Sequence, residues 1–260
     1  MSIDILKMSV PIPKLMNHQT VLFVGPHPDD IEIGAGGLAA KLALSGKRVY
    51  FCIVTDGGSG TLDPDISIER LAEIRSQETM KSASVMKVKE IFQLGFPDGG
   101  IFTSDEVASK IARVLLEVNP DLVICPDPFM PSETHPDHIK TGLAVNRAVV
   151  IANYPNMAKQ NHVIFDKTQL SHFRGRTIGY YYTHRVNEMI HLGEDDLKLK
   201  MDAIECHQSQ FPKTEDFQLI LGYLDLRSKW LLAGELSAGA EGYFVLGSTH
   251  QHCFPEINFY

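Results

Sequence analysis

Cysteine is scarce in this sequence, and its few cysteines are widely separated. Cys52, Cys125, Cys206 and Cys253 form no Cys-x-x-Cys pair and no close spacing. A zinc site closed by cysteine ligands is therefore excluded. A disulfide framework is not indicated either, so a reducing cytoplasm is the expected location. Cys52 and Cys125 stand within apolar runs, which predicts that both are buried as small hydrophobic side chains.

Long apolar runs and an excess of basic residues are also missing. No apolar run reaches the ~18 residues of a membrane span. The segment before the first apolar run lacks the apolar core and the small-residue cleavage site of a signal peptide. The net charge of −8 argues against binding to nucleic-acid phosphates, which requires a basic face. We expect neither a membrane nor a nucleic acid as a partner.

What the sequence does have is a regular alternation of apolar runs and segments with helical spacing. The predicted strands are 20–25, 48–57, 90–96 and 121–127, and the predicted helices are 35–47, 66–86, 104–119 and 135–152. Such alternation with short connections implies right-handed βαβ units. We therefore predict an α/β fold with a doubly wound, mainly parallel sheet that carries helices on both faces.

The second part of the chain is less regular. It predicts two strands joined by a turn, 177–184 and 188–192, and two helices, 195–211 and 216–236. The tail 240–254 is rich in apolar and aromatic residues, which predicts that it packs against the rest of the chain. Because no linker or repeat interrupts the sequence, we expect a single domain over residues 1–260. Residues 1–17 would be an N-terminal extension and residues 177–260 a C-terminal elaboration.

The stretch FVGPHPDDIEIGAGG (residues 23–37) places one histidine and three acids at the end of the first predicted strand. Its glycines suggest a dinucleotide-binding loop, but such a loop should begin directly after the strand. Here His27, Asp29, Asp30 and Glu32 lie between the strand and most of the glycines, and the acids would repel a pyrophosphate. A divalent ion would instead offset the repulsion between the acids. Histidine together with aspartate is a ligand set that suits zinc.

A second cluster, THPDHIK (residues 134–140), follows the fourth predicted strand. His135 and His138 are three residues apart at a helix start, so both can face the same side. In a doubly wound sheet of order 3-2-1-4-5, strands one and four are neighbours at the switch point where such folds bind ligands. Three nitrogen or oxygen ligands with an open position are typical of a catalytic zinc that activates water. A nearby carboxylate could act as the base, and a second histidine could stabilise the oxyanion. Together with the metal, these groups predict hydrolysis of an amide or ester.

With PHPDD and HPDH in this order, the sequence resembles the PIG-L/LmbE-like family of zinc-dependent N-deacetylases, which act on N-acetylglucosamine-containing compounds and have a Rossmann-like fold. The segments PDPFMPSETHPDH, YYTH and AIECHQSQF are most similar to the diacetylchitobiose deacetylases. By motif position, the resemblance implies that His27, Asp30 and His138 hold one Zn²⁺ or another divalent transition metal.

The same resemblance implies the catalytic roles. Asp29 would be the general base, and His135 would stabilise the oxyanion and protonate the leaving amine. Asp137 would orient His135, although an acid at a helix start also has a purely structural interpretation. Glu32 would lie behind the metal ligands or in solvent, and His207 would be a structural hydrogen-bonding residue.

Three further residues are candidates for binding sugar. Arg75 matches an Arg-x-x-Glu helix of the family; its alternative interpretation is a surface ion pair with Glu78. Asp98 follows the third predicted strand; its alternative interpretation is an aspartate that only forms a turn. In the diacetylchitobiose deacetylases a tail histidine reaches a neighbouring subunit's active site within a hexamer. The position that matches best is His252, which implies a homo-oligomer, either a hexamer built from trimers or a trimer. The alternative is a tail histidine on a monomer surface.

The expected function is removal of an N-acetyl group from a small amino sugar such as diacetylchitobiose. One alternative is a deacetylase or amidase that acts on a glucosaminyl conjugate in the biosynthesis of low-molecular-weight thiols. Another is a metal-containing sugar-binding protein without catalysis, which Asp29 and His135 argue against because pure binding needs neither a base nor an oxyanion stabiliser. A nucleotide-binding module is disfavoured by the acidic turn.

Overall fold

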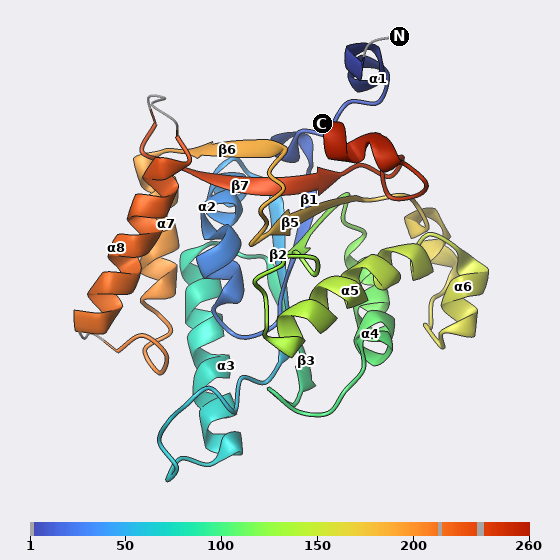
Figure 1. Ribbon diagram of the computed structural model, residues 1–260. Coiled ribbons are helices and arrows are strands. Elements are labelled where there is room, and N and C mark those ends of the chain that lie inside the picture. Colours follow the sequence, from blue (N-terminus) through green and yellow to red (C-terminus); the bar gives the residue numbers. More distant parts are fainter. Residues whose placement is uncertain (1–2, 213–214, 233–236) are drawn as a thin grey trace.

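A single mixed sheet of seven strands organises the protein (Figure 1), whose computed structural model describes residues 3–212, 215–232 and 237–260. The strand order is β3-β2-β1-β4-β5-β7-β6. The strands are β1 (Thr20–Gly25), β2 (Arg48–Thr55), β3 (Glu90–Phe96), β4 (Leu122–Pro126), β5 (Thr177–Tyr181), β6 (Glu188–Leu192) and β7 (Gly239–Leu246). β1 to β5 are all parallel, which confirms the doubly wound α/β fold and the order 3-2-1-4-5.

The far edge of the sheet differs from the prediction. Both β5 and β6 exist, but they are not neighbours, because β7 lies antiparallel between them. No strand was predicted in this part of the tail. The side-chain amide of Asn187 fixes β7 in place: its Nδ2 donates to Val245 O at 3.1 Å, and its Oδ1 accepts from Val245 N at 2.7 Å. Asn187 thereby supplies the pairing that a neighbouring strand would otherwise give.

Apolar side chains alternate between the two faces of the sheet. In β1, Leu22 and Val24 enter one core, and Val21 and Phe23 enter the other. This alternation follows from the period of two in a strand. The first core is covered by α4 (Ser104–Val118) and α5 (Pro136–Ile151), and the second by α2 (Asp30–Leu44), α3 (Ile68–Val85) and α7 (Glu194–Ile204). Figure 1 shows these two groups on opposite sides of the sheet.

The remaining elements lie at the periphery. They are α1 (Ile3–Ser9), η1 (Leu15–Asn17), α6 (Pro155–Gln160), η2 (Lys167–His172), α8 (Glu215–Trp230) and η3 (Pro255–Phe259). α8 corresponds to the predicted helix 216–236, of which residues 233–236 lie outside the described residues. No helix in the described parts of the chain combines the length and the apolar character that crossing a membrane requires.

Two helix boundaries differ from the prediction in ways that matter for the site. α2 begins at Asp30 rather than at residue 35, so Asp30 and Glu32 occupy its first turn and Asp29 directly precedes it. α7 ends at Ile204 rather than at residue 211, because His207 turns inward to meet Glu32. The segment 205–211 therefore becomes a turn that packs over α2 and α3.

The two ends of the described chain lie side by side (Figure 1). Tyr260 Oη donates to Leu6 O at 3.2 Å and to Val10 O at 2.9 Å. The buried ring of His250 also contacts Val10 O, at 3.2 Å. The tail therefore packs against the N-terminal segment, as its apolar and aromatic content predicts.

Candidate active site and metal centre

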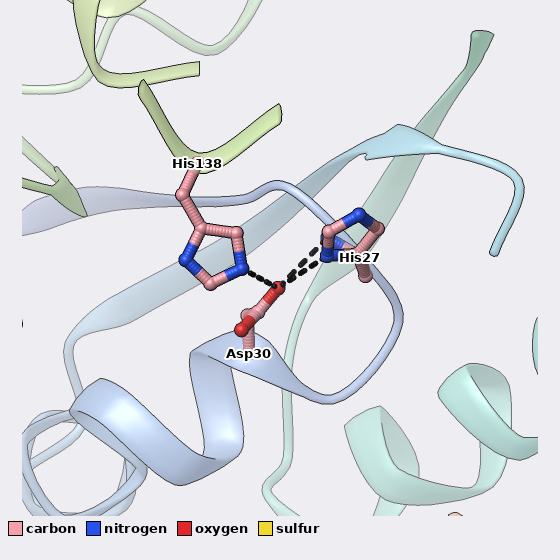
Figure 2. Close-up of side chains that lie close together, drawn as sticks. All are labelled: His27, Asp30 and His138. Atoms are coloured by element: carbon pink, nitrogen blue, oxygen red, sulfur yellow. Dashed lines mark hydrogen bonds and ion pairs between the residues drawn. The ribbon is translucent and has the colours of Figure 1, made fainter. Parts of the chain in front are cut away.

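Both sequence motifs lie at the carboxyl edge of the sheet, where β1 and β4 are neighbours. His27 follows β1, and Asp30 opens α2; His138 is in the first turn of α5. Figure 2 shows the three side chains pointing toward one another. Asp30 Oδ2 lies 3.0 Å from His27 Nδ1 and 3.4 Å from His138 Nε2. The convergence of the two motifs at the switch point is therefore confirmed.

A strained turn places Asp30 in this position. Asp29, which precedes α2, has a φ of 115°, in the left-handed region that non-glycine residues rarely adopt. The chain thereby doubles back, and Asp30 Oδ2 also accepts a hydrogen bond from His27 N at 3.0 Å. Strain of this kind clusters at functional sites, where the surrounding structure holds it in place.

The three side chains fit a divalent metal ion. Each offers one ligand atom, and the three atoms lie within 4.8 Å of one another. Two imidazole nitrogens and one carboxylate oxygen form a ligand set of the catalytic zinc type. Glu133 Oε2 lies 2.9 Å from His138 Nδ1, which directs the other ring nitrogen toward Asp30.

Glu133 was not predicted from the sequence. Its signal would have been an acid five residues before a candidate ligand, in the loop that leads to α5. A carboxylate on the outer nitrogen of a metal-binding histidine fixes the ring and raises its basicity.

The second nitrogen of His27 faces two more acids. Nε2 lies 3.1 Å from Asp98 Oδ1 and 3.5 Å from Asp137 Oδ2, but neither contact has the geometry of a hydrogen bond. Burial opposes a charge on His27, but the carboxylates of Asp137, Asp30 and Asp98 prevail and raise its pKa to about 11. Asp98, which was expected to contact sugar, lies beside this histidine in the structure.

Asp29 is buried and is held by a buried arginine. Arg75 Nη2 donates to Asp29 Oδ2 at 3.2 Å and to Pro28 O at 2.6 Å, and Nη1 donates to Gly57 O at 3.0 Å. Burial raises the pKa of Asp29 to about 7; Asp30 adds to the shift, and Arg75 opposes it. Arg75 is only 3% exposed, so its interpretation as a surface ion pair is wrong. Glu78 instead accepts from Ser209 N and Oγ.

His135 stands at the start of α5 and lines the cleft described below. Its Nδ1 accepts a 3.3 Å hydrogen bond from Asp137 N, so it is the backbone of Asp137 that contacts it. The carboxylate of Asp137, expected to orient His135, accepts from Gly99 N at 2.8 Å and from Lys140 Nζ at 3.3 Å and faces His27. Burial lowers the pKa of His135, and the neighbouring rings of His27 and His138 lower it further.

A polar cleft of about 330 Å³ opens beside these groups. Its lining comprises His27, Asp29, Ser59, Gly60, Arg75, Asp98, Gly99, His135 and Gln210. Gln210 was not predicted; its Nε2 donates to Gly60 O at 2.9 Å. The turn that carries it is fixed by the buried pair of His207 Nε2 and Glu32 Oε1, 3.1 Å apart. His207 is thus a structural hydrogen-bonding residue, as expected, and Glu32 is a buried residue in the first turn of α2.

His252 lies far from this cleft within one chain. It is exposed, and its Nε2 contacts Cys253 Sγ at 3.5 Å. It follows β7, whose last residue pairs with Ile178 near the start of β5. That register puts the tail at the amino edge of the sheet, opposite the carboxyl edge that holds the cleft.

Comparisons with known proteins agree with this geometry. A profile of the PIG-L family, described as GlcNAc-PI de-N-acetylase, matches residues 22–149. The chain is 37% identical over 237 residues to the diacetylchitobiose deacetylase of Thermococcus kodakarensis, which covers 90% of this chain and 86% of the relative. It is 30% identical over 196 residues to a probable N-acetyl-alpha-D-glucosaminyl L-malate deacetylase 2 of Bacillus cereus, which covers 73% and 83%. The solved N,N'-diacetylchitobiose deacetylase of Pyrococcus horikoshii, complexed with its inhibitor MPG, aligns over 99% of this chain and 97% of its own, with a TM-score of 0.85 and 29% identity.

Proposed function

The chain belongs to the PIG-L family, as its two motifs predicted, and we propose that it is a zinc-dependent hydrolase that removes the N-acetyl group from an N-acetylglucosamine-containing saccharide. The observation that carries this proposal is the position of Asp29. Its carboxylate is buried next to the three candidate metal ligands and accepts a hydrogen bond from Arg75. His135 lines the same cleft. A base and a second polar group beside a metal are the parts that amide hydrolysis requires.

Each residue has a distinct task in this reaction. When bound by His27, Asp30 and His138, a divalent metal supplies Lewis acidity for the attacking water and for the amide carbonyl. Asp29 takes the proton of the water as it attacks the carbonyl carbon. His135 holds the developing oxyanion and gives a proton to the amine as the C–N bond breaks. Acetate and the free amino sugar are the products.

The lining of the cleft suits a polyhydroxylated substrate. Asp98 and Gln210 present carboxylate and amide oxygens, and Arg75 presents guanidinium N–H groups. These groups make directional hydrogen bonds to hydroxyls. Because the cleft is open to solvent, a second sugar ring can extend outward from the ring that is deacetylated. The similarity to diacetylchitobiose deacetylases favours such a disaccharide.

A second candidate is a deacetylase of a glucosaminyl conjugate. It is favoured by the 30% identity to the probable glucosaminyl malate deacetylase over 73% of this chain. An acetate-release assay on the zinc-loaded enzyme distinguishes the two. It compares N-acetylglucosamine, diacetylchitobiose, longer chitooligosaccharides and N-acetylglucosaminyl malate. We expect the highest kcat/KM on diacetylchitobiose. A higher kcat/KM on the malate conjugate would favour the second candidate over our proposal. Absence of acetate release from all of these compounds would indicate a binding protein.

We also propose that the enzyme works as a homo-oligomer, a hexamer built from trimers or a trimer, in which His252 contacts the sugar bound by a neighbouring subunit. In support, His252 is exposed at the edge of the sheet opposite its own cleft, so only another subunit could bring it to a site. Light scattering that finds only monomer at micromolar concentration would contradict this proposal. Unchanged kinetics of His252→Ala on the best substrate would also contradict it. All four cysteines are free, which suits the reducing cytoplasm that we propose as the location.

A further inference from the structure

A buried aspartate at the end of β4 anchors the loop that carries Glu133. Asp127 directly follows β4, and its side chain is fully buried. Its N–H donates to Tyr181 O at 2.9 Å, which ties the end of β4 to the end of β5. Its Oδ1 accepts from Phe129 N at 3.0 Å, and its backbone O accepts from Met130 N at 3.4 Å. Asp127 therefore fixes the first turn of the loop between β4 and α5.

The carboxylate of Asp127 is held by side chains that follow β5. Arg185 Nη2 donates to both oxygens, at 3.0 Å each, and Thr183 Oγ1 donates to Oδ2 at 2.7 Å. The guanidinium of Arg185 also lies over two aromatic rings, 4.3 Å from the centroid of Phe244 in β7 and 5.7 Å from that of Phe129 in the loop. Arg185 thus joins the loop to β7 through an ion pair and two cation–π contacts.

The far end of the loop reaches both histidines of the second motif. Glu133 N donates to Met130 O at 3.0 Å, so the position of Glu133 depends on the turn that Asp127 fixes. Glu133 Oε1 accepts from His135 N at 2.8 Å, and Oε2 lies 2.9 Å from His138 Nδ1. A series of hydrogen bonds therefore connects Asp127, through the loop, to the ring of His138.

We propose that Arg185 and Asp127 are positioning residues for the metal centre: their ion pair holds the loop that places Glu133, and Glu133 fixes the ring of His138. The proposal rests on the assignment of His138 as a metal ligand in the proposed function. A carboxylate supports a metal-binding histidine only while it is held at hydrogen-bond distance. Loss of the ion pair should therefore weaken metal binding, although neither residue is a ligand.

The metal affinity of the full-length protein, measured by competition with a coloured chelator, tests the proposal. Arg185→Gln should lower the affinity for Zn²⁺ by about 10-fold. Arg185→Lys, which keeps a charged donor, should recover part of this loss. Thr183→Val removes one neutral donor to Asp127 and keeps the ion pair, so the affinity should fall by only about 2–5-fold. Arg113→Gln, at an exposed position of α4, is the matched control and should bind zinc as the wild type does.

A double variant separates positioning from general stabilisation. If Arg185 acts through Glu133, Arg185→Gln should cause no further loss of affinity in a protein that already carries Glu133→Gln. Losses that multiply in the double variant would show that Arg185 acts by another route and would overturn the proposal. Wild-type affinity in Arg185→Gln or, should that variant fail to fold, in Thr183→Val would also overturn it. A wild type that binds no zinc would instead contradict the proposed function, so the two failures are distinguishable.

Discussion

The two edges of the sheet contain buried histidines that look alike in exposure and differ in their partners. At the amino edge, His250 is 5% exposed, and the backbone engages both of its nitrogens: Nδ1 accepts from Gly247 N at 3.0 Å, and Nε2 lies 3.2 Å from Val10 O. At the carboxyl edge, His27 is 8% exposed and its Nε2 has no hydrogen bond. The two histidines are similarly buried, and they differ because the backbone engages both nitrogens of His250, whereas Nε2 of His27 faces the carboxylates of Asp98 and Asp137.

The aspartates of the two edges differ in the same way. At the amino edge, Asp121 accepts from Gln19 N at 3.0 Å and from Thr20 N at 2.8 Å. Burial opposes ionisation of Asp121, but its hydrogen bonds, led by the one to His18, hold its pKa well below the usual range. At the carboxyl edge, burial raises the pKa of Asp29 to about 7. Hydrogen bonds thus hold the carboxylate of Asp121 in its ionised form, whereas burial favours the protonated form of Asp29, which we propose as the base.

The largest effect is expected from substituting a histidine at the carboxyl edge, compared with substituting one at the amino edge. His138→Ala removes one of the three proposed metal ligands, so the bound metal and acetate release should both be lost to below detection. His250→Gln, the control at the amino edge, should keep both, although it loses stability of about 1–2 kcal/mol from two hydrogen bonds. Metal analysis and kinetics on both variants check the contrast. The assignment of His138 as a metal ligand would be wrong if His138→Ala retained the metal content and the rate of the wild type.

The next largest effect tests the base itself. Asp29→Asn keeps the shape of the side chain, and asparagine tolerates the left-handed backbone at this position. We expect normal metal content with a fall in kcat of about 10²–10⁴-fold. A variant that loses its metal would show that Asp29 is a ligand, and one that turns over at the wild-type rate would show that it is not the base.

A third substitution weakens the support of a ligand. Glu133→Gln no longer offers a charged partner to His138 Nδ1, so metal affinity should fall by about 10–100-fold while the protein stays folded. Competition with a coloured chelator measures the affinity. Glu117→Gln, at an exposed position of α4, is the matched control and should leave it unchanged. Equal affinities in the two variants would remove Glu133 from the metal centre.

A smaller effect concerns the cleft. Gln210→Leu keeps the approximate size of the side chain but removes its polar atoms, so one neutral hydrogen bond to a sugar hydroxyl is lost. We expect KM to rise by about 2–10-fold with little change in kcat. Gln160→Leu, at an exposed position of α6, should have the kinetics of the wild type. A fall in kcat with unchanged KM would contradict a role in binding.

The smallest effect on activity is expected at the amino edge. Asp121→Asn should leave kcat and KM unchanged and should lower the free energy of unfolding by about 1 kcal/mol at neutral pH. Because the folded-state pKa of Asp121 is depressed, its contribution is present above the unfolded-state pKa of about 3.9 and is lost as pH falls through the folded value. The difference in melting temperature between wild type and variant should therefore shrink toward acidic pH. A constant difference would contradict this assignment.

The sequence predicted the central part of the fold and the convergence of His27, Asp30 and His138, because these depend on local patterns. Buried parallel strands consist of continuous apolar runs, so 20–25 and 121–127 match β1 and β4 closely. Once the order 3-2-1-4-5 is assumed, the two motifs must meet. The helix start at Asp30 was missed because the left-handed backbone of Asp29 leaves no signal in residue type.

What the sequence could not provide depends on contacts between distant segments. Gln210 enters the cleft only because His207 and Glu32, 175 positions apart, form a buried pair beneath it. β7 was missed because its partners, β5 and β6, are joined to each other by a short connection that suggests a hairpin. The roles of Asp98 and Asp137 beside His27 likewise follow from the convergence of three segments.

The insertion of β7 between β5 and β6 has a consequence for synthesis on the ribosome. Tyr181 ends β5 and Leu246 ends β7, so about 65 residues must emerge before the outer edge of β5 is paired. At about 5–20 residues per second, that edge stays open for roughly 3–13 seconds. An unpaired strand edge is a template for association with another chain. The strands that position the site are therefore synthesised several seconds before the outer edge of β5 can be covered by β7.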